Sequence, residues 1–234
     1  MKIEGSVALV TGANRGLGLE FTRQLLERGA SRVYAAARNP SAVALPGVVP
    51  IRLDVTNPAQ IEAAARACGD VSLLINNAGI GKVGGLLSDG AEALLREHLD
   101  TNLFGMLNVS RAFADILGRN GGGALVNILS VLSWTSSTVL ASYGVSKAAA
   151  WSLTNGLRQE LREQGTQVLG FHAGLIDTDL VKEFDKPKSS PVDVVRLTLD
   201  ALAAGEDEVA VDDHARAVKQ GLAQGVYLAG RGAS

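Results

Sequence analysis

The sequence predicts an α/β fold in which helices cover both faces of a doubly wound parallel sheet. Three observations predict it: short runs rich in Val, Ile and Leu, helical patterns between the runs, and a glycine-rich turn after the first run. The runs are apolar throughout and do not alternate, which indicates strands buried on both faces. With 234 residues and 47% hydrophobic composition, the chain can form one large core. We therefore expect a single domain over residues 1–234.

The predicted elements alternate along the chain. The apolar runs expected to be strands are residues 6–11, 32–37, 48–53, 71–76, 124–129, 167–172 and 208–211. Helical patterns separate them at residues 16–29, 58–68, 143–164 and 191–203, while residues 88–119 form either one long helix or two abutting helices. Asn57 and Ser190 are expected helix caps, each followed by a proline suited to the first helical position. This β-α-β repetition predicts a Rossmann-type, three-layer αβα architecture with a ligand crevice at the carboxyl ends of the strands.

The overall composition argues against several classes of partner. The net charge is -2, so no basic field would attract nucleic acid. Cys68 is the sole cysteine, which excludes an internal disulfide and fits a reducing cytoplasm. His98, His172 and His214 show no metal-ligand spacing with one another or with Cys68, so we expect structural or surface histidines and no metal. The uncharged stretch 120–146 is interrupted by polar residues, and the first residues show neither a signal peptide nor an anchor, so no membrane partner is expected.

The stretch TGANRGLG, residues 11–18, leads from the first predicted strand into the first predicted helix. Its glycines permit a tight turn and the close approach of a pyrophosphate, which then meets unpaired amides at the helix N-terminus. A strand before and a helix after are the context of a dinucleotide-binding turn, and they favour nucleotide binding over a purely structural turn. The residues expected to contact the cofactor here are Gly12, Asn14, Arg15, Gly16, Leu17 and Gly18.

The end of the second predicted strand favours NADP(H) over NAD(H). A carboxylate at this position pairs with the ribose hydroxyls of NAD, whereas a cation accommodates the 2'-phosphate of NADP. The strand ends in AAARNP, which places Arg38 there and no Asp or Glu, and Arg15 adds a second guanidinium. The alternative is that both arginines are solvated surface charges.

Tyr143 and Lys147 lie four residues apart in SYGVSKAAAW, residues 142–151. In a helix they share one face, so both side chains can act on the same group. A cation beside a phenol lowers the pKa of the phenol toward neutrality, which would make Tyr143 a proton donor. The alternative for an isolated motif of this kind is that Tyr143 packs while Lys147 is solvated.

Together these segments resemble the single-domain short-chain dehydrogenases/reductases, and the resemblance covers nearly the whole chain. The segments that carry it are TGANRGLG at 11–18, LDV at 53–55, NNAG at 76–79, TNLFG at 101–105, VNILS at 126–130 and YGVSK at 143–147. The resemblance implies a catalytic tetrad of Asn102, Ser130, Tyr143 and Lys147. It further implies cofactor contacts from Asp54, Val55, Asn76, Ala78, Gly79, Gly174, Ile176 and Thr178, in addition to Tyr143 and Lys147.

Each member of the tetrad has an expected role. Tyr143 gives its proton to the carbonyl oxygen as hydride arrives from the nicotinamide. Lys147 stabilises the phenolate and, by the resemblance, holds the nicotinamide ribose. Ser130, thirteen residues before Tyr143, hydrogen-bonds the substrate oxygen. For Asn102 the resemblance implies a local helix distortion that supports a water chain to Lys147.

The substrate side departs from the usual pattern of the family. Ala173 stands where the family has proline, which removes a fixed φ and predicts a less rigid loop. The segment between Thr178 and Pro191 is short, which suggests an open pocket. Its expected walls favour an apolar or aromatic carbonyl compound, although Trp134 fits the core equally well. These walls are Leu132, Trp134, Val139, Leu175, Leu180 and Phe184.

The end of the chain also departs from the family. Many relatives use an Asp-Gly-Gly signature there in tetramer packing, whereas this chain continues into a helix from about Asp213. The apolar side of that helix is expected to hold Ala217, Val218, Leu222 and Ala223. The tetramer is therefore in doubt. The resemblance favours a homodimer through residues 99–119 and 143–164, and a monomer stays open.

The combined expectation is a cytoplasmic NADPH-dependent carbonyl reductase, reversible as an alcohol dehydrogenase, acting on a small or medium-sized ketone or aldehyde. Two alternatives stay open. An epimerase or dehydratase of nucleotide sugars uses the same Tyr-Lys pair, although the glycine spacing and the chain length oppose it. A non-catalytic NADP(H)-sensing protein would adopt the same fold without needing a proton donor.

Overall fold

Seven parallel strands form one sheet at the centre of the molecule. The computed structural model describes residues 1–228, with the side chain of Leu180 excepted. The strand order is β3-β2-β1-β4-β5-β6-β7, which confirms the doubly wound α/β prediction. The strands are β1 (Val7–Thr11), β2 (Arg32–Ala37), β3 (Val49–Arg52), β4 (Leu73–Asn76), β5 (Ala124–Ile128), β6 (Gln167–His172) and β7 (Glu208–Ala210).

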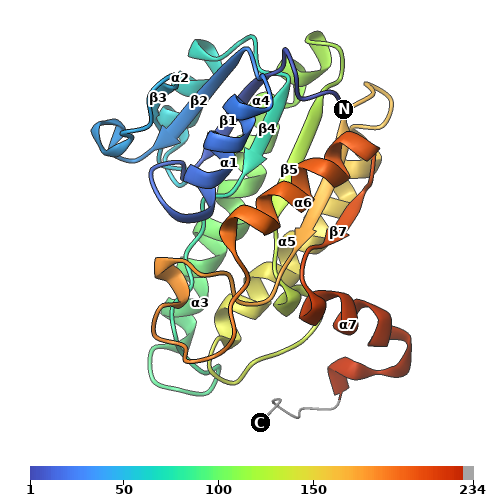
Figure 1. The fold of residues 1–234 in the computed structure, drawn as a ribbon. Helices are drawn as coiled ribbons and strands as arrows, with labels where there is room; N and C mark the ends of the chain where they lie inside the picture. The colour runs from blue at the N-terminus through green and yellow to red at the C-terminus, as the bar shows by residue number, and fades with distance from the viewer. Residues whose placement is uncertain (229–234) are drawn as a thin grey trace.

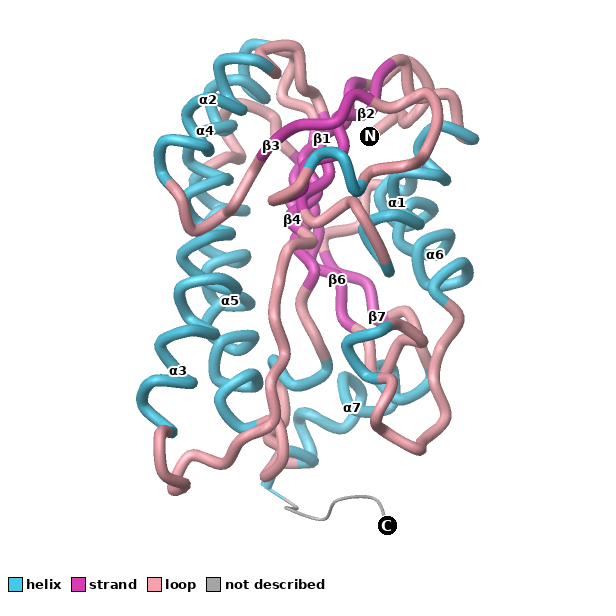
Figure 2. The backbone as a smooth tube through the Cα atoms, turned by 90° about the vertical axis from the view of Figure 1, so that its left-hand side faces the viewer, coloured by secondary structure: helices cyan, strands magenta, loops and turns pink. Residues whose placement is uncertain are grey.

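Helices cover both faces of the sheet, as Figures 1 and 2 show. On one face lie α1 (Gly16–Glu27) and α6 (Pro191–Ala204), and on the other lie α2 (Pro58–Ala67), α4 (Met106–Arg119) and α5 (Ala141–Glu160). Helix α3 (Ala91–Leu99) packs beside α5, and α7 (Asp213–Gly221) lies below the sheet near β7. The three-layer αβα architecture is thereby confirmed.

Each face of the sheet has its own apolar core, because side chains along a strand point alternately to opposite faces. Val10, Ile75 and Val126 join the core under α1 and α6. Their neighbours Leu9, Leu74 and Leu125 join the core under α2, α4 and α5. Burial on both faces explains why these strands read as unbroken apolar runs in the sequence.

The helix starts and stops follow local chemistry. The side chain of Asn57 accepts a hydrogen bond from the Gln60 amide at the start of α2, and Ser190 accepts one from Asp193 at the start of α6. Both caps agree with the sequence prediction. The choice left open for residues 88–119 is resolved as two helices, α3 and α4, joined by a π-helical segment, Asp100–Gly105.

Of the four residues expected on the apolar side of the terminal helix, Val218 and Leu222 pack against the rest of the chain and the two alanines do not. Ala215 and Val218 are the buried residues of α7, and Leu222 is half-buried. Ala217 and Ala223 are exposed. The helix meets the rest of the chain along one narrow seam against Val131 and Trp134, which sequence periodicity alone does not locate.

The sheet order places the functional crevice. Strands β1 and β4 are neighbours at the centre, and from them the chain winds outward in opposite directions. The loops that follow these two strands separate there, which opens a crevice at the carboxyl ends of the strands.

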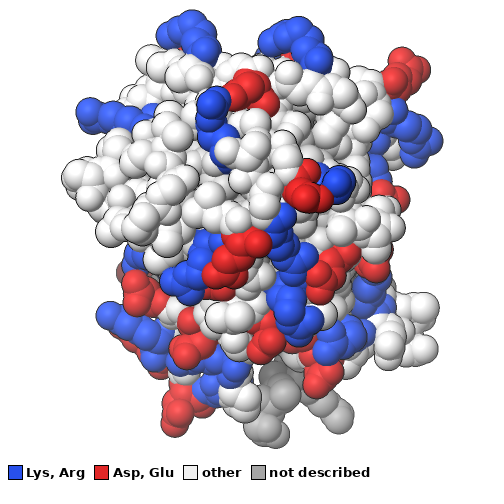
Figure 3. Space-filling view, turned by 45° about the horizontal axis from the view of Figure 1, so that its top comes forward, with Lys and Arg blue, Asp and Glu red and all other residues white. Residues whose placement is uncertain are grey.

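On the face shown in Figure 3, basic and acidic side chains are intermixed. Among the helices of the described residues, none has the length and apolar character needed to cross a membrane.

Candidate active site

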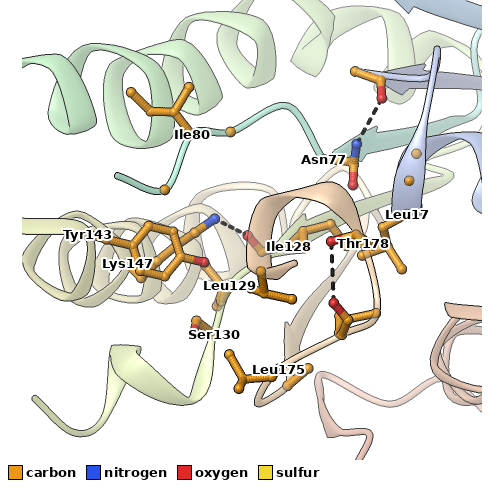
Figure 4. A pocket seen from close by; sticks show the side chains of 18 of the residues that line it. Leu17, Asn77, Ile80, Ile128, Leu129, Ser130, Tyr143, Lys147, Leu175 and Thr178 are labelled. Atoms are coloured by element: carbon orange, nitrogen blue, oxygen red, sulfur yellow. Dashed lines mark hydrogen bonds between the residues drawn. The ribbon is translucent and has the colours of Figure 1, made fainter. Parts of the chain in front are cut away.

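A cleft of about 1750 Å³ runs along the carboxyl ends of the strands. One end is formed by the glycine turn after β1, and the other by Ser130, Tyr143 and Lys147. Figure 4 shows these two ends, with Leu17 and Asn77 on one side and Tyr143, Lys147 and Ser130 on the other. The sequence-predicted cofactor residues and proton-transfer residues thus face one continuous space.

The glycine turn has the shape that a pyrophosphate requires. Gly12 and Gly16 adopt φ values of +67° and +53°, which side chains disfavour. A Cβ on Gly18 would lie 2.3 Å from the Gly12 carbonyl oxygen. Arg15, the residue before helix α1, makes no side-chain cap, so the first amides of the helix are open to an anion. The turn therefore fits a dinucleotide phosphate, and Asn14 and Leu17 line the cleft beside it.

Two arginines, Arg15 and Arg38, line the cleft together with Asp54 and Val55. Hydrogen bonds from Thr56 lower the pKa of Asp54, and the charge of Arg38 lowers it further. Asp54 is therefore held as a carboxylate beside Arg38. The second arginine, Arg15, donates to Asp179 at 2.9 Å across the cleft mouth, and both side chains of this ion pair are exposed.

Asn76 does not line the cleft, and the expectation that it contacts the cofactor was wrong. It follows the alternation of β4 and points, like Leu74, into the core under α4 and α5. Its Nδ2 donates to Ser110 Oγ at 2.9 Å and to Asn127 Oδ1 at 3.0 Å. The cleft position belongs to Asn77, whose Nδ2 donates to the Thr11 carbonyl at 2.8 Å. Ala78 and Gly79 also line the cleft.

The proton-transfer group comes from α5 and from the end of β5. Lys147 is 4% exposed, and its Nζ donates to the Ile128 carbonyl at 2.7 Å. The same Nζ lies 5.6 Å from the centroid of the Tyr143 ring. Tyr143 precedes Lys147 by one helical turn, so both side chains reach the cleft where Ser130 follows β5.

Burial shifts both titrating groups of this pair. It lowers the pKa of Lys147 to about 8 and raises the pKa of Tyr143 to about 12, against an opposing interaction with Ser130. The expected lowering of the phenol pKa by Lys147 is therefore not found in the structure, because burial disfavours the charged phenolate and only the hydrogen bond with Ser130 opposes it. The two pKa values, nearly equal in the free amino acids, move apart, so transfer of a proton from the Lys147 ammonium to a Tyr143 phenolate is favourable.

Asn102 lies behind the cleft surface. It is fully buried in the π-helical segment, which is the local distortion implied for this position. Its Oδ1 accepts from the Ile80 amide at 2.8 Å, and its Nδ2 donates to the Ile80 carbonyl and to Ser146 Oγ, both at 2.9 Å. Asn102 thus joins the loop after β4 to α5.

The loop after β6, which begins at Ala173, is joined by hydrogen bonds to two other segments of the chain. The Gly174 amide donates to Asp212 Oδ2 at 2.7 Å, and the Ser189 amide donates to the Leu175 carbonyl at 2.8 Å. Within the loop, Thr178 Oγ1 donates to the Ile176 carbonyl at 3.3 Å. Gly174, Ile176 and Thr178 all line the cleft. The sequence analysis did not identify Asp212. It joins the loop to a segment that is distant in the sequence, and no motif around Asp212 indicates this contact.

The apolar walls of the substrate side are mostly where they were expected. Leu132, Val139, Leu175 and Phe184 line the cleft. Trp134 does not: it is 8% exposed and stacks on His172 with ring centroids 3.8 Å apart. Its assignment to the pocket was wrong, because the short helical turn after Ser130 directs it toward β6. The side chain of Leu180 lies outside the described residues.

The histidines are not equivalent. His172 is fully buried behind Ser130, with Nδ1 3.0 Å from the Ser130 carbonyl oxygen and Nε2 3.3 Å from Glu208 Oε2. His214 lines the cleft, and His98 is buried beside Tyr143. Among residues 1–228, no three His, Cys, Asp or Glu side chains are grouped so as to hold a metal ion.

Known proteins share both the sequence pattern and the structure. The short chain dehydrogenase family matches residues 6–189. The 3-oxoacyl-(acyl-carrier-protein) reductase FabG of Vibrio cholerae is 33% identical over 191 residues, 78% of each chain. The 3-alpha-(or 20-beta)-hydroxysteroid dehydrogenase of Mycobacterium bovis is 31% identical over 188 residues, 76% of this chain and 72% of its own.

Among solved structures, a short chain dehydrogenase from Burkholderia cenocepacia in complex with NADP has a TM-score of 0.93 and 41% identity, covering 96% of this chain and 95% of its own. A family member from Burkholderia phymatum in complex with NAD has a TM-score of 0.81 and 27% identity, covering 94% and 93%. The chain therefore belongs to the short-chain dehydrogenase family, whose members are oxidoreductases that use a nicotinamide cofactor to interconvert CH–OH and C=O groups.

Proposed function

We propose that the protein is an NADP(H)-dependent carbonyl reductase, reversible as an alcohol dehydrogenase, for small or medium-sized apolar or aromatic ketones and aldehydes. The observation that carries the proposal is the convergence of Ser130, Tyr143 and Lys147 at one end of the cleft that begins at the glycine turn. A sensor of NADP(H) needs the turn but has no use for a buried lysine beside a tyrosine in the same cleft.

The residues present fit the cofactor along the whole cleft. The amides of residues 12–18 would hold the pyrophosphate, Asp54 and Val55 the adenine side, and Ile176 and Thr178 the carboxamide side. When bound, the nicotinamide supplies or accepts the hydride. The loop from Gly174 to Thr178 excludes water on that side, because Asp212 and Ser189 tie it down.

Proton transfer in this proposal belongs to the side chains of the chain itself. The Tyr143 hydroxyl gives its proton to the carbonyl oxygen during reduction and takes it back during oxidation. The Ser130 hydroxyl donates to the same oxygen and stabilises its developing negative charge. Lys147, whose burial lowers its pKa to about 8, re-protonates the phenolate and is held in place by the Ile128 carbonyl.

The preference for NADP(H) is supported by charge. Arg38 lines the adenine side of the cleft, and Arg15 lies at the mouth beside it. A guanidinium accommodates a 2'-phosphate, and two of them suit bidentate contact. The Burkholderia cenocepacia relative was solved with NADP, which agrees with this choice. The pairing of Arg15 with Asp179 makes Arg38 the stronger of the two determinants.

The substrate class is supported by the pocket walls. Leu132, Val139, Leu175 and Phe184 surround the space in front of Ser130 and Tyr143, and apolar walls favour apolar or aromatic groups beside the carbonyl. One relative is named for 3-oxoacyl groups and another for hydroxysteroids, both of which combine a carbonyl or alcohol with an apolar body.

We further propose a cytoplasmic homodimer through α4, α5 and the π-helical segment. Phe104 and Val145 expose 48% and 40% of their surface on these elements, which supplies apolar area that a second copy of the chain could cover. Sedimentation of the purified protein tests the dimer: a monomer at micromolar concentration would contradict it, and substitution of Phe104 by Lys should dissociate it. Fractionation of the source cells tests the compartment.

The test of the activity is consumption of NADPH and NADH with a panel of aliphatic, aryl, keto-ester and sugar carbonyls. The proposal predicts turnover with NADPH well above NADH, and with apolar carbonyls above sugars. Equal efficiency with both cofactors would contradict the cofactor assignment. Cofactor binding without turnover of any carbonyl would favour the sensor.

A further inference from the structure

His98 is a fully buried histidine next to the proposed proton donor. It belongs to α3, which packs against α5. The edge of its ring meets the Tyr143 ring, with centroids 6.1 Å apart and planes at 70°. Its side chain does not reach the cleft surface, so any effect on the reaction must act through Tyr143 or through the loop that His98 holds.

The partners of the His98 ring determine its protonation state. The Nδ1 atom lies 2.9 Å from the Leu94 carbonyl oxygen, which can only accept, so Nδ1 carries a proton. The Nε2 atom accepts from the Lys82 amide at 3.0 Å, so Nε2 cannot carry one. Both nitrogens are satisfied only in the neutral Nδ1–H tautomer. Protonation of Nε2 would break the bond to Lys82.

His98 and Asn102 act on the same loop. They are four residues apart and share one face of the helix. His98 holds the Lys82 amide, and Asn102 holds both main-chain groups of Ile80. The residues between β4 and these two contacts, including Gly79 and Ile80, line the cleft.

The same helix face meets α5 at the proton-transfer pair. His98 packs on Tyr143, and Asn102 donates to Ser146, the neighbour of Lys147. The loop after β4 and the Tyr143 ring therefore share one support, the face formed by His98 and Asn102, in addition to the bonds that Thr11 makes at the start of the loop. Displacing His98 would move a wall of the cleft and the phenol together.

We propose that neutral His98 is a positioning residue for proton transfer by Tyr143. Its hydrogen bonds to Lys82 and Leu94 fix the position of the phenol ring relative to the loop after β4. This proposal rests on the proposed role of Tyr143. It assigns to His98 a part in the reaction that sequence spacing did not reveal.

Protonation of His98 is opposed by its surroundings. Burial lowers the pKa of the imidazole, against the opposing influence of the Leu94 carbonyl. The charged groups that face it are Glu97 and Lys82, which pair with each other, and Lys147 from α5. The phenol of Tyr143 is the other titratable group in contact. Below the pKa of His98 the Lys82 contact is lost, so kcat of the wild type should fall there.

The test compares three variants. His98→Phe keeps an aromatic ring against Tyr143 but removes both hydrogen bonds. His98→Gln restores an acceptor that can meet the Lys82 amide. Asn120→Leu is the matched control, because Asn120 also anchors a loop next to β4, at its other end, through the Gly69 and Val71 carbonyls. For each protein, kcat and KM are measured against pH, and the Kd for NADPH is measured by fluorescence.

The expected result is a loss of about tenfold or more in kcat for His98→Phe, with smaller changes in KM and in the NADPH Kd, since misplacement of a reacting group lowers the rate of the chemical step. The acid limb of the kcat profile that belongs to His98 should disappear in that variant. His98→Gln should recover most of kcat. Asn120→Leu should lower thermal stability and leave kcat and its pH profile unchanged.

Two results would overturn the proposal. One comes from the variants: wild-type kcat and pH profile in His98→Phe, or the same loss of kcat in Asn120→Leu as in His98→Phe. If His98→Phe does not fold, an unchanged acid limb in His98→Gln, which has no imidazole to titrate, overturns the proposal instead. The other, which needs no variant, is an imidazole ¹⁵N spectrum at neutral pH that shows His98 protonated on Nε2. Failure of the proposed function is distinguishable, because a fully active Tyr143→Phe would remove the role of Tyr143 without changing the His98 tautomer.

Discussion

Lys147 Nζ donates a hydrogen bond of 2.7 Å to the main-chain carbonyl of Ile128, the last residue of β5. The Lys147 side chain extends from α5, and its amine is held in place by a hydrogen bond to the main chain of the sheet. A long, rotamer-rich side chain is fixed in this way beside the Tyr143 ring. The catalytic geometry depends on the packing of β5 against α5 as much as on the four-residue spacing.

Removing the Lys147 amine is predicted to reduce turnover strongly. Lys147→Met keeps the stem but leaves the Ile128 carbonyl without its partner and the phenolate without a proton source, so kcat should fall by about a hundredfold, as for loss of a general acid–base group. Steady-state kinetics with NADPH and an aryl ketone measure this. A variant with kcat within twofold of the wild type would show that Lys147 does not serve proton transfer.

The pH dependence of reduction should follow the amine. Burial lowers the pKa of Lys147 to about 8, so the ammonium is present below that pH and is lost as pH rises through it. The rate of reduction should decline over the same range.

Folding stability should change with pH in the opposite direction. Between pH 8 and the ordinary lysine pKa of about 10.4, Lys147 is protonated in the unfolded chain and neutral in the folded one, so the free energy of unfolding increases as the pH rises. The check is the melting temperature of the wild type minus that of Lys147→Met, measured at several pH values. This difference should increase as the pH rises from 8 to about 10.

Gly18 in the glycine turn and Gly156 in α5 offer a matched pair of glycine-to-alanine substitutions. In Gly18→Ala the new Cβ would meet the Gly12 carbonyl oxygen at 2.3 Å, so the backbone must move where the pyrophosphate binds, and NADPH affinity should fall at least about tenfold. Gly156→Ala in α5 meets nothing within 4 Å. It should leave affinity unchanged and raise stability by about 0.5–1 kcal/mol, since alanine favours a helix interior. Unaltered NADPH binding in Gly18→Ala would place the phosphates elsewhere.

Arg38 is predicted to carry most of the cofactor preference. Arg38→Leu should raise the Kd for NADPH by about tenfold, the value of one charge-assisted contact, and leave the Kd for NADH unchanged. Arg52→Leu is the control, since Arg52 is an exposed arginine at the end of the neighbouring strand β3. An equal loss of both cofactors in Arg38→Leu would mean that Arg38 supports the fold and does not contact the 2'-phosphate.

Asp212 is predicted to couple stability to cofactor binding. Its Oδ1 caps α7 through the Ala215 amide, and its Oδ2 holds the Gly174 amide. Asp212→Ala should cost about 1–2 kcal/mol in unfolding free energy from the lost cap and also raise the KM for NADPH. The adjacent, fully exposed Asp213 provides the comparison: Asp213→Ala should change neither quantity appreciably. A stability loss in Asp212→Ala with an unchanged KM would limit Asp212 to capping.

The parts of the fold that the sequence predicted are those set by local chemistry. Strands β2 and β6 begin and end at the predicted residues, because each is built on an uncharged run, VYAAA and VLGF, with a polar residue on either side. The caps at Asn57 and Ser190 depend on side chains within three residues of the helix start. The glycine turn is likewise fixed by backbone sterics within one segment.

The parts that could not be predicted depend on which way a side chain faces in the packed structure. Asn76 and Asn77 are adjacent and chemically identical, and the alternation of β4 alone sends one into the core and the other into the cleft. Trp134 turns toward His172 because of a short helical turn that no periodicity marks. The role of His98 follows from two main-chain partners, one of them sixteen residues away.

The central claim is that Tyr143 passes the proton, and the most direct measurement is the turnover of Tyr143→Phe beside its NADPH affinity. The substitution removes the hydroxyl and little volume. The account predicts an NADPH Kd within about twofold of the wild type and a loss of at least about a hundredfold in kcat, the value of a positioned general acid. Carbonyl reduction by Tyr143→Phe at the wild-type rate would contradict it.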